Sequence, residues 1–357
     1  MDEKYYHPKM KGIVVKNNKG IPAYYFELFI LTPKGKRGIS KYLGRKMPSS
    51  EELAPKIFDY YQEFGDIVKT LVPQSTKDYF KYTGLNEIEK NRFRYWGLKH
   101  ELNKKKLDHF QVVFMILFIL NSARAEGSRM KKEDLEHSIA NKKPKSFEQR
   151  EALNTLMAIR WAFSDQFTWS TLSIRKLHGI LFDGIEPDLA GKYKPYDNVV
   201  GSRIKGEIIE TTPYQKVPEK MRLWVEEVKK YRKKIYPPVF ALESHLKFES
   251  IHPFHDGNGR IGRILLNRLL LENSFMPVIF FEENHQAYCN SISLAREGRK
   301  DKYIKLFVKQ LKKTWKVFCE EEENKEFVST RKKLAISLVN TGKRNVVKFG
   351  KLPPRFK

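Results

Sequence analysis

Residues 251–263 read Ile-His-Pro-Phe-His-Asp-Gly-Asn-Gly-Arg-Ile-Gly-Arg, and this stretch decides the fold around it. A helical pattern runs up to Pro253, whose ring disfavours helix in the residue before it. Residues 256–259 predict a tight turn, and we expect a second helix to begin near Arg260. Glycines lack a Cβ and let backbone N–H groups approach a ligand. Because amides at the start of a helix favour anions, the stretch predicts an anion site between two helices.

Four side chains of this stretch supply the chemistry of a phosphate site. Arg260 and Arg263 are three residues apart, so they share a helix face and reach successive phosphates. Asp256 is a hard oxygen ligand suited to Mg²⁺ that bridges phosphates. His252 is a base whose ordinary pKa predicts a rate that rises through about pH 6–7. The pattern indicates phosphoryl or nucleotidyl transfer.

Three other interpretations of these residues stay open at this point. Residues 257–262 match the dinucleotide pattern GxGxxG, although no strand is expected before them. A zinc site would use His245, His252, His255 and Asp256, although no HExxH pairing occurs. The third is a capped helix turn with solvated arginines. An ordinary Walker A loop is excluded, because neither Gly-Lys-Ser nor Gly-Lys-Thr occurs in the chain.

Residues 252–263 resemble the signature of Fic-domain proteins, HPFx[D/E]GNGRxxR, at every specified position, and the similarity covers about residues 80–310. The resemblance implies Mg²⁺-dependent transfer of AMP from ATP to a Ser, Thr or Tyr hydroxyl of a protein, called AMPylation. It implies that His252 deprotonates the target hydroxyl and that Asp256 holds Mg²⁺. The nucleotide phosphates would be bound by Gly257, Asn258, Gly259, Arg260 and Arg263.

The resemblance extends to three further features. Kinases of the Doc type have Lys where this chain has Gly259, so Gly259 favours AMP transfer over phosphate transfer. Val199, Val200 and Gly201 would form a flap on which an extended target segment pairs as an added strand. Tyr288 would face the adenine, although Cys289 replaces the second aromatic residue that the family often has there.

Residues 121–127, Asn-Ser-Ala-Arg-Ala-Glu-Gly, match the family's inhibitory pattern [S/T]xxxE[G/N] through Ser122, Glu126 and Gly127. Gly127 is suited to end a helix as its left-handed cap. Glu126 then lies in the last turn, where the helix dipole disfavours an anion and a cationic partner is expected. By resemblance that partner is Arg263, which could then not bind the terminal phosphate. A chance match or a plain helix cap stays open.

The rest of the chain predicts a mainly α fold: a Fic helical core with a β-hairpin flap, plus a small N-terminal β unit. We expect a β module at 1–46, an N-terminal helical region at 50–165 that carries the inhibitory helix, a Fic core at 170–317 and a basic tail at 331–357. Helical spacing of apolar residues marks the following segments: 53–70, 86–104, 108–126, 146–163, 170–182, 216–234, 239–251, 259–273, 285–297 and 300–317. The hairpin is expected within 183–215.

The charge and composition of the chain limit which partners and compartments are expected. The chain has 357 residues, 68 Lys+Arg against 42 Asp+Glu and a net charge of +26, which attracts polyanions or simply forms a solvated lysine-rich surface. Two cysteines exclude a disulfide scaffold and fit a reducing cytoplasm. The longest apolar run, 112–120, is about half of a membrane span, so we expect a core helix and no membrane partner.

The sequence therefore favours a cytoplasmic protein adenylyltransferase that uses ATP and Mg²⁺, acts on a protein target or on itself, and is inhibited by Glu126. A bifunctional or de-AMPylating enzyme, with Glu126 orienting a water, is the first alternative. The second is a nucleotide-sensing or nucleic-acid-binding protein with an idle site. A homodimer stays open as well.

Overall fold

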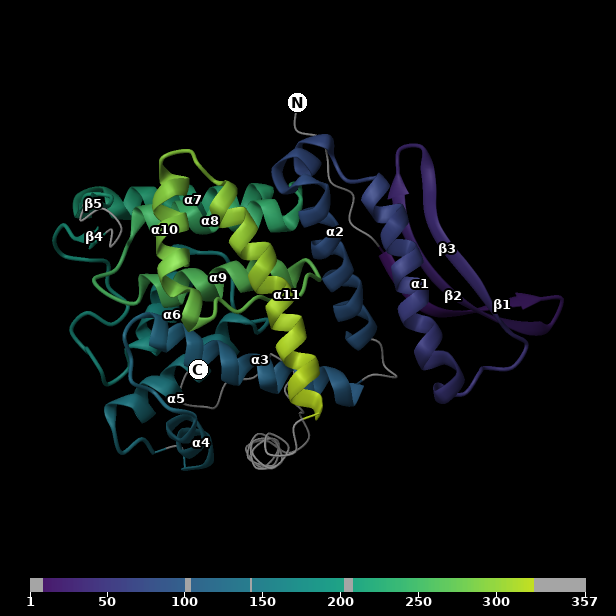
Figure 1. Ribbon diagram of the computed structural model, residues 1–357, viewed down its shortest axis with the longest axis horizontal. Coiled ribbons are helices and arrows are strands. Elements are labelled where there is room, and N and C mark those ends of the chain that lie inside the picture. Colours follow the sequence, from purple (N-terminus) through teal and green to yellow (C-terminus); the bar gives the residue numbers. More distant parts are fainter. Residues whose placement is uncertain (1–8, 100–103, 142, 202–207, 324–357) are drawn as a thin grey trace.

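The computed structural model describes residues 9–99, 104–141, 143–201 and 208–323. A three-stranded sheet with one helix against it forms one end of the molecule, and a helical body forms the rest (Figure 1). A short hairpin lies at the opposite end of the body from the sheet. The mainly helical fold with a small N-terminal sheet is confirmed. The predicted tail at 331–357 lies outside the described residues.

The N-terminal sheet is an antiparallel meander of β1 (Lys9–Asn18), β2 (Ile21–Thr32) and β3 (Gly35–Gly44), in the order β1-β2-β3. Lys19 and Gly20 join the first two strands, both with positive φ, as a tight two-residue hairpin requires. One face of β2 packs its fully buried apolar side chains on α1 (Ser50–Thr70) and on Trp96. The sheet therefore shares its core with the first helices.

The helical body is built from ten further helices and one hairpin within the described residues. The hairpin pairs β4 (Val199–Gly201) with β5 (Ile208–Glu210) in antiparallel register. The helices are α2 (Gln74–Lys99), α3 (Lys104–Ala125), α4 (Lys132–Asn141), α5 (Phe147–Ala162), α6 (Thr171–Leu181), α7 (Val217–Tyr231), α8 (Pro237–Ile251), α9 (Asn258–Glu272), α10 (His285–Arg296) and α11 (Asp301–Glu323).

The structure differs from the sequence-based segments at two places. Helix α2 begins at Gln74 rather than near residue 86, and its backbone leaves the helical region at Lys81 (φ 55°, ψ 163°). Its first part is held by tertiary contacts, because Phe80 is buried and the Tyr79 hydroxyl donates to Glu243. Helix α4 was not expected, since only two large apolar residues fall within it. Tertiary packing overrides weak local periodicity in both segments.

Helix α3 is the apolar centre of the body and packs against α2, α5, α9 and α11. Residues Leu107–Ala125 are long and apolar enough to cross a membrane by length and composition, with a mean hydropathy of 1.2. Of that window, 67% is buried inside the protein, as in a core helix. Helices α3 and α5 both contact α9, which also pairs with α8. Glu126, just after the last residue of α3, lies against Gly259 in the first turn of α9, so the α8–α9 loop lies beside the carboxyl end of α3.

Candidate active site

His252 terminates α8 in the left-handed conformation (φ 49°, ψ 62°), and its backbone N–H donates to the carbonyl of Phe248 at 3.0 Å. The strained backbone turns the chain away from the helix axis at the first residue of the motif. Burial, together with the nearby cations Arg296 and Lys194, lowers the pKa of the imidazole to about 4. The side chain is therefore neutral at pH 7, as a general base requires.

The loop after His252 is closed by the side chain of Asn258. Its amide donates to the Phe254 carbonyl at 2.8 Å and accepts from the Phe254 N–H at 2.9 Å. Gly257 caps α9 with φ +74°, and a Cβ there would lie 2.5 Å from the ring of Phe182. Glycine is therefore required at position 257. The side chain of Asn258 holds the loop in shape through its two bonds to the backbone of Phe254.

His178 of α6 packs against this loop. Its ring stacks between Phe254, at 4.0 Å, and Phe182, at 4.5 Å between centroids. Its Nδ1 accepts from the Gly191 N–H at 2.9 Å, so Nε2 carries the proton and donates to the Asp256 carbonyl at 3.2 Å. Burial lowers the pKa of His178 to about 4, which keeps the ring neutral.

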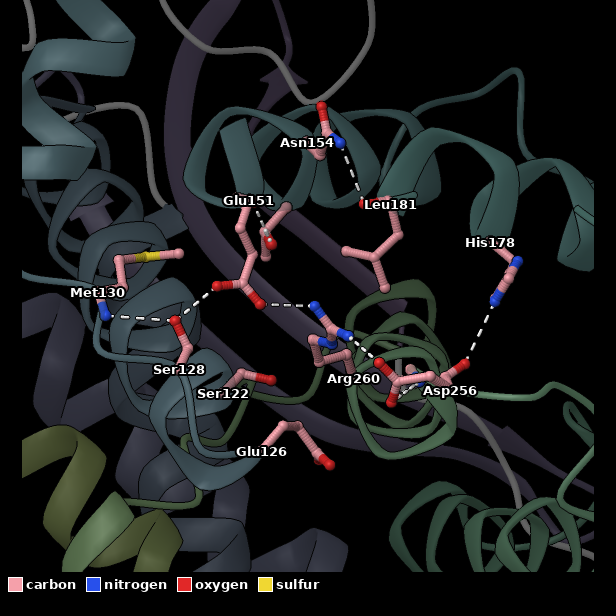
Figure 2. A network of polar contacts seen from close by, with 12 residues as sticks. Ser122, Glu126, Ser128, Met130, Glu151, Asn154, His178, Leu181, Asp256 and Arg260 are labelled. Carbon is pink, nitrogen blue, oxygen red and sulfur yellow. Dashed lines mark hydrogen bonds and ion pairs between the residues drawn. The ribbon is translucent and has the colours of Figure 1, made fainter. Parts of the chain in front are cut away.

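Arg260 is held by a chain of polar contacts that Figure 2 shows. Its guanidinium donates to Glu151 of α5 at 2.7 Å and to Asp256 at 3.2 Å. Glu151 in turn accepts from the Ser128 hydroxyl at 2.5 Å. The side chains of Arg260 and Glu151 are both nearly buried, whereas that of Asp256 keeps 54% exposure. The structure thus fixes one arginine of the motif and leaves the Asp256 carboxylate open to solvent.

Arg263 is 1% exposed and faces the end of α3. It donates from Nε to the Ser122 hydroxyl at 3.0 Å and from Nη2 to the Ser122 carbonyl at 2.9 Å. Nη2 also donates to Oε1 of Glu126 at 2.7 Å. The pairing expected from the sequence, Glu126 with Arg263, is present. Burial opposes the charge of Glu126, but Arg263 and Arg260 hold the pKa of that carboxyl below its usual value.

The end of α3 has the geometry that aims Glu126 at this arginine. The N–H groups of Gly127 and Ser128 donate to the carbonyls of Arg124 and Ala123, at 2.9 and 3.2 Å. With Gly127 at φ +90°, these bonds form a Schellman motif, which confirms the predicted glycine cap. Glu126 is the cap residue itself and projects from the helix end.

The Glu126 carboxylate lies on the first turn of α9. A Cβ built on Gly259 would be 2.3 Å from Oε1 of Glu126 and 3.0 Å from Nη1 of Arg263. The carboxylate therefore occupies the surface that a glycine leaves open at the N-terminus of a helix, where anions are favoured. An acidic side chain fills part of the predicted anion site.

Comparison with known proteins identifies this arrangement. Residues 169–270 match the model of the Fic/DOC family. This part of the chain is a Fic domain. The curated protein "Protein adenylyltransferase Fic" of Drosophila willistoni is 26% identical over 144 residues, which are 40% of this chain and 27% of that protein. A protein of Aquifex aeolicus named "Probable protein adenylyltransferase" is 52% identical over 54 residues, 15% of this chain and 16% of that one.

A solved Fic-domain-containing signaling protein from Bacteroides thetaiotaomicron shares the fold, with a TM-score of 0.55 at 19% identity. The match covers 65% of this chain and 95% of that one. The chain spans only about a quarter of the Drosophila protein and a smaller part of the Aquifex protein. The comparisons therefore give the domain and its fold.

Two of the alternative interpretations do not agree with the structure of the Fic domain. The GxGxxG pattern at 257–262 follows helix α8 and opens α9, so no βαβ unit surrounds it. His245 lies in the core, where the hydroxyls of Tyr303 and Tyr288 bond to its ring at 2.8 and 3.1 Å. Across the described ranges no group of three or more His, Cys, Asp or Glu gathers in a metal-binding arrangement.

Tyr288 is buried rather than part of an open surface against which an adenine ring would pack. Its ring is buried beside the Arg263 guanidinium at 5.7 Å, and its hydroxyl reaches His245. Glu249 completes this cluster, and burial raises its pKa to about 7. A Cβ on Gly262 would lie 2.5 Å from the Glu249 carboxylate, so Gly262 is a packing requirement of the domain. The contact of Tyr288 with adenine stays a prediction.

The β4–β5 hairpin, which the sequence predicts as a flap, is tied at its base to the loop that follows α8. The buried ammonium of Lys194 donates to Asn198 and to Thr211, both at 2.6 Å, on the two arms of the hairpin. The Lys194 N–H also donates to the Pro253 carbonyl at 2.9 Å. Val199 is exposed at the start of β4, beside Val200 and Gly201. The expected hairpin is present, while residues 202–207 lie outside the described part.

Sequence reasoning missed the residues that position the motif: Ser128, Glu151 and Lys194. Glu151 is an ordinary polar residue in the pattern of α5, and its partner lies 109 positions away. No local signal marks such a pair. A buried lysine or glutamate is identified only once the fold brings its partner to it.

Proposed function

We propose that this chain transfers the AMP moiety of ATP to a hydroxyl group on a protein. The observation that carries the proposal is a neutral, partly buried His252 one loop away from a helix N-terminus with two motif arginines. The names of the Drosophila and Aquifex relatives support it for the domain that they share. The target, the cytoplasmic location and self-AMPylation belong to the same proposal.

The reaction assigns one task to His252. The oxygen of a Ser, Thr or Tyr hydroxyl attacks the α-phosphorus, and its proton passes to the imidazole. The new bond joins that oxygen to phosphorus, and the bond from phosphorus to the bridging oxygen breaks, so pyrophosphate leaves. The edge of β4 (Val199–Gly201) that is not paired with β5 would hold the target segment as an added strand.

Mg²⁺ fits the donor set near the loop. It usually keeps several waters and binds one or two carboxylates together with substrate phosphates. The half-exposed Asp256 carboxylate offers such a ligand beside the anion site. The ion would neutralise phosphate charge. The backbone amides of residues 257–259 and Arg263 would hold the phosphates. Arg260, which Glu151 holds in place, would add its positive charge near the phosphates.

We infer that Glu126 inhibits the enzyme in this state. Its carboxylate takes the hydrogen bond from Arg263 and the space over Gly259 that a terminal phosphate would use. Two negative groups do not share that space, so ATP would bind with its phosphates displaced. The inhibition and the nucleotide site thus depend on the same arginine.

A second candidate, removal of AMP from a protein, is favoured by one observation. Glu126 uses Oε1 for Arg263, and its side chain remains 29% exposed. A carboxylate held in that way would orient a water towards a phosphorus atom. In that case the enzyme with Glu126 intact would release AMP from a labelled protein, and the Glu126→Gln variant would not.

The position of the label in ATP tests the proposal. Incubation of the Glu126→Gly variant with Mg²⁺ and α-labelled ATP should label protein, while γ-labelled ATP should not. His252→Ala in the same background should abolish labelling and keep nucleotide binding. Transfer of the γ-label would show phosphate transfer instead, and labelling by the His252→Ala variant would remove the assigned base.

A further inference from the structure

Helix α11 carries a line of lysines that the Fic chemistry does not use. Lys302, Lys305, Lys309, Lys312 and Lys316 follow one another at spacings of three and four residues, which places them on one helix face. No Asp or Glu occurs between residues 302 and 319. The opposite face is apolar and enters the core through Tyr303, Phe307 and Leu311.

The lysine line is not explained by the stability of the helix. Like charges three or four residues apart destabilise a helix, whereas alternating Glu and Lys would stabilise it. The line runs from Lys302 to Lys316, or about 21 Å along the axis. Any polar residues on this face would make the helix amphipathic. The concentration of one sign of charge therefore needs another explanation.

Helix α2 lies beside α11 (Figure 1), and the two helices border a groove of about 880 Å³. Its walls carry seven cationic side chains and one acidic side chain, Glu87. The cations are Lys90, Arg94, Lys305, Lys309, Lys312, Lys313 and Lys316. Trp315 also lines the groove, with the Arg94 guanidinium 5.5 Å from its ring. The groove combines positive charge with one partly buried aromatic ring.

Part of this charge has no acidic partner among the residues that the structure describes. Lys312 approaches Glu87 at 3.8 Å, and Lys313 pairs with Glu283. Neither Lys90 nor Lys305 forms an ion pair or a side-chain hydrogen bond with any residue that the structure describes. Lys305, Lys309 and Lys316 are exposed. A surface of this kind attracts a polyanion.

We propose that the α2–α11 groove binds single-stranded nucleic acid through its phosphodiester backbone. A positive groove that follows a backbone, with an aromatic ring for base stacking, is the usual site for single strands. From Lys305 to Lys316, about 17 Å along the axis, one strand with B-form spacing presents about five phosphates, opposite the four lysines of the line that border the groove. This binding is independent of the proposed AMP transfer, since none of its residues belongs to the catalytic loop.

Fluorescence anisotropy with a labelled oligothymidylate of about 20 nucleotides tests the groove. The test variant replaces Lys305, Lys309, Lys312 and Lys316 by Gln. The matched control replaces four exposed lysines of the α7 region by Gln: Lys229, Lys230, Lys233 and Lys234. Both variants lose four positive charges, so the general attraction of a basic protein changes equally. An oligouridylate and a DNA duplex serve as further ligands.

We expect the groove variant to lose about tenfold or more in affinity at about 100 mM salt, and the control to lose much less. The slope of log K against log salt should fall by up to about 3, since each single-strand phosphate contact contributes about 0.7. Equal losses in the two variants, or no measurable binding by the unaltered chain, would overturn the proposal. Tighter binding of the duplex than of the single strands would also contradict it.

A second measurement needs no variant. Acetylation of lysines in the full chain, followed by peptide mass spectrometry, reports which amines the oligonucleotide covers. Lys90, Lys305 and Lys309 should be protected by oligothymidylate, while Lys229 and Lys230 should react as before. Protection of the α7 lysines in place of those in the groove would place the nucleic acid elsewhere and refute the assignment.

Discussion

Replacement of Glu126 by glycine removes one of the two acceptors of Nη2 of Arg263 and clears the surface of Gly259. Arg263 keeps two hydrogen bonds to Ser122, so its side chain remains in place and stays pointed at the helix N-terminus. The variant should therefore fold, and its terminal-phosphate site should be open. We expect AMP transfer to rise above that of the unaltered protein.

The size of the increase follows from the contact. A hydrogen bond between charged groups contributes about 1.5–3 kcal/mol. Glu126 is 29% exposed, and screening by solvent reduces that value to about 1–2 kcal/mol. If ATP must displace this contact to bind productively, its loss increases the rate by about 5- to 30-fold. Glu126→Gln should give a smaller rise, because the amide still fills the space over Gly259.

The assay is incorporation of α-labelled AMP at fixed ATP and Mg²⁺, with Glu126→Gly/Arg263→Ala as the control that should lose the gain. A thermal melt adds an independent readout: ATP should stabilise Glu126→Gly by more than it stabilises the unaltered chain. Equal rates and equal ATP-induced shifts for the two proteins would show that residues 122–127 form only a capped helix end.

Three further predictions concern the proposed base and the residues that pack around and position the site. The rate of AMP transfer should be constant from about pH 6 to 8 and fall only below about pH 5, because His252 has a pKa near 4 and must be neutral to act. A rate that rises through pH 6–7 would contradict the lowered pKa. Gly262→Ala should lower the melting temperature by overpacking Glu249, at a cost of about 1–3 kcal/mol, and an unchanged melt would refute that contact. Glu151→Gln should break a buried ion pair with Arg260, cost about 3–5 kcal/mol and raise the KM for ATP; a stable variant with an unaltered KM would remove Glu151 from the positioning of the site.

The sequence predicts the catalytic loop because its signals are local. Pro253 and Gly257 mark the end of one helix and the start of the next, and the structure has both boundaries within two residues of the expected positions. Gly127 marks the end of α3 for the same reason. Resemblance to the Fic family supplied the long-range pair of Glu126 and Arg263, which no local pattern reveals.

The remaining features depend on tertiary structure. The ordinary pKa of a histidine predicts a transition at pH 6–7, whereas burial of His252 moves it to about 4. Gly262 occupies a variable position of the signature, yet the nearby Glu249 leaves no room for a side chain. Glu151 becomes a partner of Arg260 only after α5 packs on α9. Burial and contacts across the chain decide these properties.

A crystal structure of the Glu126→Gly variant with Mg²⁺ and a non-hydrolysable ATP analogue tests the central claim most directly. We predict the terminal phosphate on Arg263 and over Gly259, where the Glu126 carboxylate lies now. We predict the α-phosphate within reach of a hydroxyl that hydrogen-bonds to His252. An analogue bound elsewhere, or one whose phosphates leave Arg263 in contact with Ser122 alone, would contradict the account.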